Sequence, residues 1–341
     1  MNMFIKRYLR AFGQTWRLAS RVVLLMFAVS VCAVSPARAV LKGDAELLKL
    51  TATTHKDNRE RIHTWQGSAQ VEVTYKDANG LMLEQKVSVP FLFDNKQDAI
   101  RWKWISQQHL VRKQGQLVSY RERLETTNAM TKGDGFYNYA PRITKRDGER
   151  LSALVIWPRA RARELSETDC FHPMWYLTGH MTKCTDDLAE RLMYLHRKAN
   201  TRGFSSNVTV TRDGDVVILE LHSEVVLNHF EFDLFKGGNI VKYYGKGKTA
   251  TELREWTYEE KDRIWVVNTF ALDIQYNSPQ SLGITHRIRK VTFVENTLNR
   301  PIPPSEFSLE KLGVKVGDRV TDRIRGLSYI YDGTEKLSLE D

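Results

Sequence analysis

The sequence predicts a mainly β (α+β) fold in which one large antiparallel sheet, or two halves of one, carries two or more helices. From Trp65 onward, apolar and polar residues alternate with a period of two over most of the chain, which is the pattern of half-buried strands. Short stretches rich in Gly, Asn and Asp separate these runs, as hairpin turns do. Two stretches instead place apolar residues at helical spacing.

The first of these helical stretches covers residues 45–62. Its apolar residues form one stripe among charged residues, and Gly43-Asp44 can cap its N-terminus. A helix of this kind at the start of a β-rich domain usually packs its stripe onto a sheet. A second helix is predicted over residues 186–197, with Thr185 as its cap and Gly203 beyond its end.

The first half of the chain is predicted to be an antiparallel meander with one apolar face. Asn79-Gly80 supplies residues that tolerate positive φ in the first turn. The predicted strands cover residues 65–76, 81–93, 100–104 and 117–124. Further turns are predicted at residues 132–135 and 146–148, where Gly and Asp cluster.

The second half of the chain returns to strands after the second helix. These strands cover residues 208–212, 216–221, 227–234, 240–244, 252–258, 264–276 and 285–297. Three prolines in residues 301–313 then interrupt the sheet, which resumes near residues 327–331. No internal repeat or low-complexity linker divides the chain. We therefore expect a single domain over residues 40–341, with a C-terminal Pro-rich extension from about residue 300.

The first 39 residues have the pattern of a cleaved export signal. Residues 22–34 form an uncharged run of 13 residues, which is shorter than the roughly 20 residues that span a bilayer as a helix. Basic residues precede this run, and Ala37 and Ala39 form the A-x-A pattern that signal peptidase reads. We expect cleavage after Ala39 and a soluble periplasmic protein of 302 residues. An uncleaved membrane anchor is the alternative.

The formal charge of +10 first suggests a nucleic-acid binder. Six basic residues and no acidic residue lie in the first 39 positions, so the remainder holds 45 basic and 41 acidic residues. Basic residues alternate with apolar ones at residues 101–104 and 287–290. In a strand they would form the outer face, Arg287 and Arg289 among them. We therefore predict no nucleic-acid partner, while a basic outer face could meet anionic lipid headgroups or an acidic partner.

The cysteines predict a disulfide. Cleavage of the signal would remove Cys32 and leave Cys170 and Cys184 as an even pair in an oxidising compartment. Closing a loop of about 15 residues would contribute roughly 3 kcal/mol to stability. The alternative is a metal site that also uses His172 and His180. Zinc sites usually space their ligands more widely than Cys170-x-His172, which favours the disulfide.

The order of these features resembles the bacterial periplasmic LolA/LolB lipoprotein-carrier superfamily. The resemblance rests on the export signal, an amphipathic helix ending in residues 58–62, and Trp65-x-Gly67-x-Ala69 at the start of long strands. Residues 302–307 (IPPSEF) and 312–318 (LGVKVGD) look like the tail of large, lipoprotein-sorting-like members. The resemblance implies a curved antiparallel sheet forming an open, incomplete β-barrel, with the N-terminal helix and the second helix covering its concave side. Characterised members hold lipoprotein acyl chains in that cavity.

A carrier for acyl chains needs an apolar concavity, and an incompletely closed sheet with aromatic and aliphatic residues on its inner face can supply one. The same residues would otherwise form an ordinary packed core under the helices. The predicted lining residues are Trp65, Val71, Val73, Val89, Phe91, Phe93, Trp102, Trp104, Phe230, Phe232, Phe270 and Ile274.

No catalytic signature is found. The chain has no Gly-rich phosphate loop, no G-x-S-x-G elbow, no H-E-x-x-H and no paired zinc-binding cysteines. No catalytic residue, metal ligand or cofactor is therefore assigned, and most of the nine histidines are expected to be surface or packing residues. The densest polar cluster is His172, His180, Asp186 and Asp187 around the cysteine pair. An enzyme activity or a metal would be sought there first.

The predicted function is a non-catalytic, monomeric periplasmic carrier or binding protein for a hydrophobic ligand, namely the acyl chains of a lipoprotein or a lipid. The alternative is a cell-envelope protein-interaction or scaffolding module on the same fold, with a filled core and no ligand. A third reading is a hydrolase or metal protein that uses the region from Cys170 to Cys184. The first two hypotheses differ in whether the interior of the sheet is an open cavity or a packed core.

Overall fold

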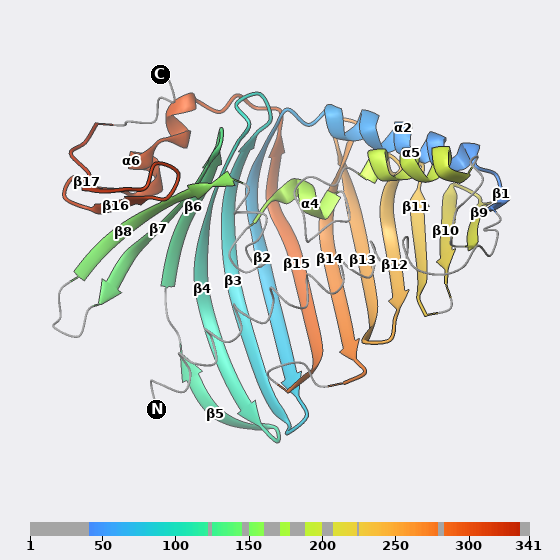
Figure 1. The fold of residues 1–341 in the computed structure, drawn as a ribbon, viewed down its shortest axis with the longest axis horizontal. Helices are drawn as coiled ribbons and strands as arrows, with labels where there is room; N and C mark the ends of the chain where they lie inside the picture. The colour runs from blue at the N-terminus through green and yellow to red at the C-terminus, as the bar shows by residue number, and fades with distance from the viewer. Residues whose placement is uncertain are drawn as a thin grey trace.

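The computed structural model of the chain describes residues 41–121, 125–144, 150–159, 171–177, 188–199, 207–223, 225–278 and 283–334. Strands dominate this part of the chain and form one strongly curved sheet, and two helices run side by side across one end of its strands (Figure 1). The predicted signal segment, Cys170, His180, Cys184, Asp186 and Asp187 lie outside the described residues.

The centre of the sheet consists of long antiparallel strands that pair along most of their length. In spatial order they are β4 (Ala99–Lys113), β3 (Leu81–Asp94), β2 (Thr64–Asp77), β15 (Ile284–Leu298), β14 (Ile264–Tyr276) and β13 (Ala250–Lys261). The predicted ranges match five of these strands to within three residues at each end. The prediction covered only the first third of β4, whose paired length is set by β3.

The sheet continues on both sides of this centre. One flank consists of β12 (Asn239–Lys246), β11 (Leu227–Asp233), β10 (Val216–His222), β9 (Asn207–Asp213) and β1 (Leu41–Gly43). The other consists of β6 (Glu125–Lys132), β7 (Gly135–Thr144), β8 (Arg150–Pro158), β16 (Arg319–Asp322) and β17 (Leu327–Ile330). No pairing within the described ranges joins β1 to β17, so the sheet is an open, incomplete barrel.

The strand predicted over residues 117–124 is in fact two strands. The far half of β4 pairs with β5 (Gln116–Arg121), and its near half pairs with β6. Strands β7 and β8 were not assigned from the sequence. Phe136 of β7 is buried in one hydrophobic cluster, while Tyr137 and Tyr139 are buried in another. A strand that is covered on both faces lacks the apolar-polar alternation by which strands are recognised.

Both predicted helices are present. They are α2 (Glu46–Glu60) and α5 (Leu188–Ala199), and they contact each other across the sheet end. His196 of α5 lies 3.0 Å from the Glu46 carboxylate of α2. Asp44 accepts a hydrogen bond from the backbone N–H of Glu46 at the start of α2, which supports the predicted cap. The predicted cap of α5, Thr185, lies outside the described residues.

Buried polar contacts fix α2 on the sheet. The Asn58 side chain donates to the backbone oxygen of Trp265 at 2.9 Å and accepts from its backbone nitrogen at 2.8 Å. His55 is fully buried and lies 2.9 Å from the side-chain oxygen of Asn239. Gly238, at φ +64°, lies so close to α2 that an added Cβ would be 2.8 Å from the Thr51 carbonyl oxygen. A glycine is therefore required where the β11–β12 turn meets the helix.

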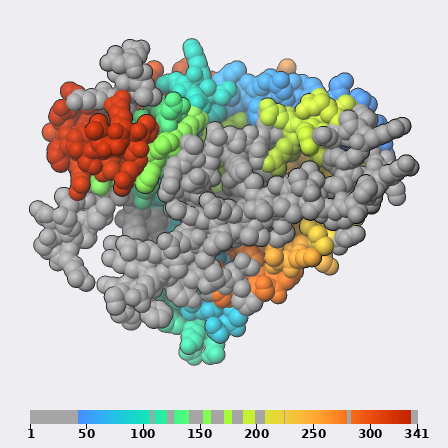
Figure 2. Space-filling model, in the orientation of Figure 1, coloured from blue at the N-terminus to red at the C-terminus, as the bar shows by residue number. Residues whose placement is uncertain are grey.

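The core is divided into two hydrophobic clusters on opposite faces of the sheet. The interior cluster lies on the concave face and includes Trp65 and Trp102 together with apolar residues of α2 and α5. The C-terminal cluster lies on the other face, because Met130 belongs to it and its neighbour Ala129 belongs to the interior cluster. The C-terminal cluster is built with η1 (Pro304–Phe307) and α6 (Leu309–Leu312). These C-terminal elements gather at one corner of the molecule (Figure 2).

We predict that Asn58→Ala lowers the free energy of unfolding by about 2–4 kcal/mol, because it removes two hydrogen bonds and leaves two partly buried backbone groups of Trp265 without the Asn58 side chain. Chemical denaturation monitored by circular dichroism would measure the change. Asp57→Ala, on the exposed side of the same helical turn, is the control and should change stability by less than about 0.5 kcal/mol. Equal effects of the two substitutions would contradict the anchoring role of Asn58.

Candidate functional site

The concave face is built by rows of side chains that the strand register aligns. One row crosses five neighbouring strands, from Val87 through Val71, Val291 and Phe270 to Trp256. Each of these five residues is buried. Because alternate residues of a strand point to the same face, the rows two residues away along each strand face the interior as well. The register thus makes one continuous surface from residues far apart in the chain.

All twelve predicted lining residues belong to the interior cluster. Trp104, Phe230 and Ile274 are partly buried against it, and the other nine are buried within it. Aromatic contacts link several of them, such as Trp65 with Phe91 at 5.8 Å between ring centroids. The structure therefore brings the predicted residues together on one face.

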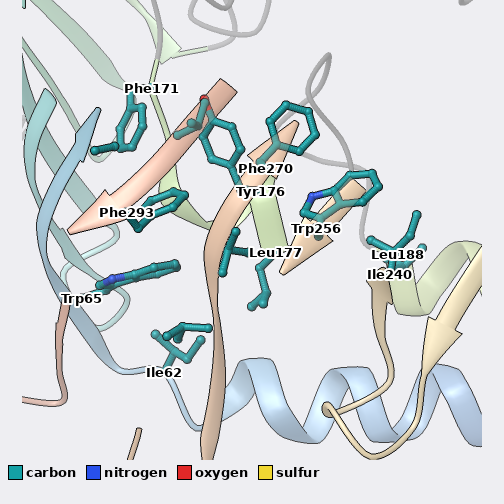
Figure 3. Close-up of a cluster of buried hydrophobic side chains, with 14 of the residues drawn as sticks. Ile62, Trp65, Phe171, Tyr176, Leu177, Leu188, Ile240, Trp256, Phe270 and Phe293 are labelled. Atoms are coloured by element: carbon teal, nitrogen blue, oxygen red, sulfur yellow. The ribbon is translucent and has the colours of Figure 1, made fainter. Parts of the chain in front are cut away.

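A short segment outside the sheet covers part of this face. It consists of Phe171, His172 and the helix α4 (Pro173–Leu177), and we call it the cover segment. Phe171 packs at 5.3 Å from Phe91, and Tyr176 packs at 5.4 Å from Phe293 and 5.5 Å from Phe270. Figure 3 shows Phe171 and Tyr176 lying between the side chains of the strands. Leu177 is buried in the same cluster.

The sequence did not reveal the cover segment, nor two buried aromatic residues of the concave face, Phe293 and Trp256. The segment FHPMWYL is rich in aromatic and apolar residues, but it is too short and too irregular to show either helical or strand periodicity. Phe293 and Trp256 lie on strands that were predicted, but no predicted lining residue lies on either strand. Their inward direction follows from the strand register, which aligns Phe293 with Ala69 and Trp256 with Phe270.

Two arginines on the concave face correct a prediction. Arg287 and Arg289 were expected on the outer face of their strand, but they are only 3% and 2% exposed and lie on the inner face. They share the phase of Val291 and Phe293 on β15, whereas Lys290 is exposed on the opposite face. The apolar residues at positions 291 and 293 fix which face of β15 is inside, and the arginines must follow.

Each of these arginines lies against an aromatic ring. The guanidinium carbon of Arg287 is 5.7 Å from the centre of the Tyr75 ring, and that of Arg289 is 5.9 Å from the Tyr176 ring. Arg289 also donates a hydrogen bond of 2.7 Å to the Tyr176 hydroxyl. The cover segment is therefore held by a buried polar contact as well as by apolar packing.

The polar part of the concave face extends to β13 and β12. Arg254 forms an ion pair with Glu252 and lies 5.3 Å from the Tyr243 ring. The Tyr243 hydroxyl donates to the side-chain oxygen of Asn228 at 2.9 Å. Burial raises the pKa of Tyr243 well above its usual range, so this hydroxyl stays protonated and remains a donor.

Three indole groups place N–H donors in the interior. Trp102, Trp104 and Trp256 have buried ring nitrogens without a hydrogen-bond acceptor in the described part of the chain. Buried indole N–H groups normally have an acceptor. Trp256 lies two residues from Arg254 on the same strand and contacts Phe270 at 5.2 Å.

Of the four residues in the polar cluster predicted around the cysteine pair, only His172 lies within the described ranges. Its ring lies between Phe93, at 5.3 Å, and Trp175, on which it stacks at 5.5 Å. Burial lowers the pKa of His172 to about 3, with a further lowering from the charge of Arg159. The neutral ring accepts the backbone N–H of Met174 at its Nδ1 atom. This histidine thus fixes the start of α4 through packing and one hydrogen bond.

The described residues also bear on the metal site and the membrane anchor, which the sequence left open as alternatives. Within the described ranges, no group of three or more His, Cys, Asp or Glu side chains is arranged to hold a metal ion. None of the helices in the same part of the chain is long and apolar enough to cross a membrane.

Comparisons with known proteins find structural neighbours only. The chain matches no protein-family model and no curated protein. A putative outer membrane lipoprotein-sorting protein domain from Vibrio parahaemolyticus is 12% identical, with 79% of this chain and 99% of that chain covered and a TM-score of 0.39. A DUF1329 family protein from Desulfovibrio piger is 10% identical, with 79% and 98% covered and a TM-score of 0.39.

A LolA superfamily protein from Nitrosomonas europaea is 9% identical, with 76% of this chain and 98% of that chain covered and a TM-score of 0.32. The structural neighbours thus include a lipoprotein-sorting protein domain and a LolA superfamily protein. At these TM-scores the neighbours supply no residue-by-residue correspondence for the concave face.

We predict that acid weakens the fold through His172. Its pKa is about 3 in the folded chain and about 6.5 in the unfolded chain. Between these values the unfolded chain binds more protons, so the free energy of unfolding falls as the pH falls from about 6.5 towards 3. The slope contributed by one histidine is at most about 1.4 kcal/mol per pH unit.

Urea denaturation at pH 7, 6, 5 and 4 would measure this slope. His172→Asn removes the titrating ring, and its side-chain oxygen can still accept the N–H two residues on. This variant should show a shallower dependence on pH than the wild type. His63→Asn, at an exposed position, should keep the wild-type dependence. Parallel curves for the wild type and His172→Asn would refute the assignment.

Proposed function

We propose that the protein is a periplasmic carrier or binding protein that holds acyl chains of a lipoprotein or a lipid against the concave face, without covalent chemistry. The observation that carries the proposal is the cover segment. Seven residues that do not belong to the sheet cover part of the concave face, including that of the 13-residue strand β14. An acyl chain can take the place of this segment without breaking a strand pairing.

The energetics favour such an exchange. Burial of each methylene group contributes roughly 0.8 kcal/mol, so a chain of about 15 methylenes contributes on the order of 12 kcal/mol before ordering costs. Opposing this is the exposure of Phe171, Tyr176 and Leu177, each of which contributes about 1.5–3 kcal/mol when buried. The hydrogen bond from Arg289 to Tyr176 adds about 1.5–3 kcal/mol. The two sums are close enough for reversible binding.

The mature chain is proposed to be a periplasmic monomer that has lost its export signal and contains one disulfide. Export would remove the first 39 residues by cleavage after Ala39, place the protein in the periplasm and allow Cys170 and Cys184 to form a disulfide. The protein would act as a monomer, because every part of the proposed site lies on one chain. Basic residues on the outer face, such as Lys86 and Lys290, would allow contact with anionic headgroups at a membrane surface.

The second candidate is an envelope protein-interaction or scaffolding module. Phe171, Tyr176 and Phe293 pack against one another within contact distance, and such packing is also expected of a permanently filled core. The two functions differ in whether the cover segment leaves the sheet when a lipid is present.

The decisive experiment compares two Leu→Ala substitutions with a fluorescent long-chain fatty acid as the probe. Leu177 is fully buried in the cover segment, whereas Leu117 is 53% exposed on β5. Leu177→Ala weakens the cover segment by about 2–4 kcal/mol. If the ligand must displace this segment, the variant should bind the probe at least tenfold more tightly than the wild type. Leu117→Ala should bind the probe as the wild type does.

Two results would favour the scaffolding function instead. One is the absence of probe binding by the wild type together with the absence of lipid or lipopeptide in native mass spectra of protein purified from its own envelope. The other is a Leu177→Ala variant that loses thermal stability and gains no affinity for the probe. Circular dichroism of both variants would verify that the sheet is intact.

A further inference from the structure

Three side chains on one side of the concave face have buried polar atoms without a hydrogen-bond partner in the described part of the chain. They are Trp102, Trp104 and Thr131, and we call them the donor cluster. Trp102 is 1% exposed and Thr131 is 6% exposed. An indole N–H can only donate, and a hydroxyl can donate as well. Because buried N–H and O–H groups normally have an acceptor, the donor cluster is suited to a ligand that supplies acceptor oxygens.

The strand register brings these three side chains together. Trp102 and Trp104 are two residues apart on β4, so they point to the same face at a separation of roughly 7 Å. Thr131 lies on β6 in phase with Ala129, which pairs with Trp102 and belongs to the interior cluster. The three side chains thus occupy adjacent inward-facing positions on two neighbouring strands.

The rows of aligned residues that contain Trp102 and Thr131 are uncharged. A buried carboxylate or phosphate requires a cation to offset the loss of its hydration, whereas a neutral carbonyl oxygen requires only hydrogen-bond donors. These rows therefore favour an uncharged acceptor. The rows are Phe91, Trp102, Ala129 and Asn138, and Phe93, Ile100, Thr131 and Phe136.

The donor cluster lies at one end of the cover segment. The Trp104 ring meets Phe171, the first residue of that segment, edge-on at 6.3 Å between ring centroids. From there the cover segment extends to Tyr176, which contacts Phe270 of β14. An acyl chain that takes the place of the cover segment would therefore have one of its ends beside the donor cluster.

We propose that the donor cluster binds the carbonyl oxygen of an uncharged acyl ester or amide, whose chain takes the place of the cover segment. This inference rests on the proposed carrier function and assigns a binding site to the head of the ligand. Burial of hydrocarbon depends on apolar area and does not distinguish one long-chain compound from another. The donor cluster supplies that distinction, since a carbonyl oxygen has two lone pairs that accept hydrogen bonds.

The test compares four long-chain probes by their displacement of a fluorescent fatty acid from the full mature chain. Monooleoylglycerol carries an ester carbonyl, and its ether analogue keeps the chain and the glycerol but lacks the carbonyl oxygen. The ester should bind at least tenfold more tightly than the ether, because two further hydrogen bonds in a buried site have an effect of this size. Oleate should bind more weakly than the ester. N-oleoylethanolamine is the matching amide, and the stronger of ester and amide identifies the linkage.

The variants Thr131→Val and Trp104→Phe remove a polar group and keep most of the apolar volume. Each should reduce the preference for the ester over the ether by at least threefold, with the affinity for the ether unchanged. The matched controls are Thr292→Val, on the outer face of β15, and Trp265→Phe, whose ring contacts the 69% exposed Phe235 outside the interior cluster. Both controls should keep the wild-type preference. Thr131→Val retains the shape of the side chain and covers the case in which the tryptophan variant does not fold.

Proton NMR spectra give a structural readout besides affinity. The indole N–H resonances of Trp102 and Trp104 are assigned by their loss in Trp102→Phe and Trp104→Phe. Both resonances should move further downfield on binding of the ester than on binding of the ether, since only the ester supplies a carbonyl acceptor. The Trp265 resonance should be the same with either probe.

The possible failures are distinguishable. Equal affinity of the wild type for the ester and the ether would overturn this inference and leave the carrier function in place, as would tighter binding of oleate than of the ester. Binding of none of the lipid probes would overturn the carrier function together with the inference. An unchanged preference in both Thr131→Val and Trp104→Phe would show that water satisfies the donor cluster and would overturn the inference. Equal losses in the variants and their controls would do the same, because they would show a general effect on the fold.

Discussion

The strand register of the central sheet is the constraint on which the rest of the structure depends. Strands β2, β3 and β15 are 14, 14 and 15 residues long and pair side by side. A slip of one residue in any of them would send every concave side chain to the outer face. The register is secured near one end, where Trp65 donates to the Asn296 side chain at 2.9 Å and Gly67 allows the β15 bulge to approach closely.

The register also explains why one face contains both an aromatic cluster and buried cations. On β15, the positions that place Phe293 inside place Arg289 and Arg287 inside as well. The cost of burying these cations is offset by the Tyr75 and Tyr176 rings and by the Tyr176 hydroxyl. The strand register thus places both apolar and cationic residues on the concave face, and Tyr176 of the cover segment offsets part of the cost of burying the cations.

The elements differ in how readily the sequence revealed them. Long strands that are covered on one face, such as β14, were predicted to the residue. Strand β7 was missed, because Phe136 and Tyr137 are buried on opposite faces and remove the alternation. Helix α2 was predicted from its apolar stripe, while α4 was missed because its five residues are shorter than two helical turns. The sequence therefore predicted the strands that form the concave face but not the helix α4 that covers part of it.

The sequence by itself determined the class of fold, the extents of five central strands, the helix that lies against them and the apolar residues of the concave face, because periodicity is a local property of the chain. Only the tertiary structure decided what completes that face. Phe171, Tyr176 and Leu177 reach it from a segment that follows no period. The face on which Arg287 and Arg289 lie is set by their neighbours on the strand and by its pairing with β2 and β14. The pairing of β15 with β2 and the hydrogen bond from Arg289 to Tyr176 join residues more than 100 positions apart, which no local pattern encodes.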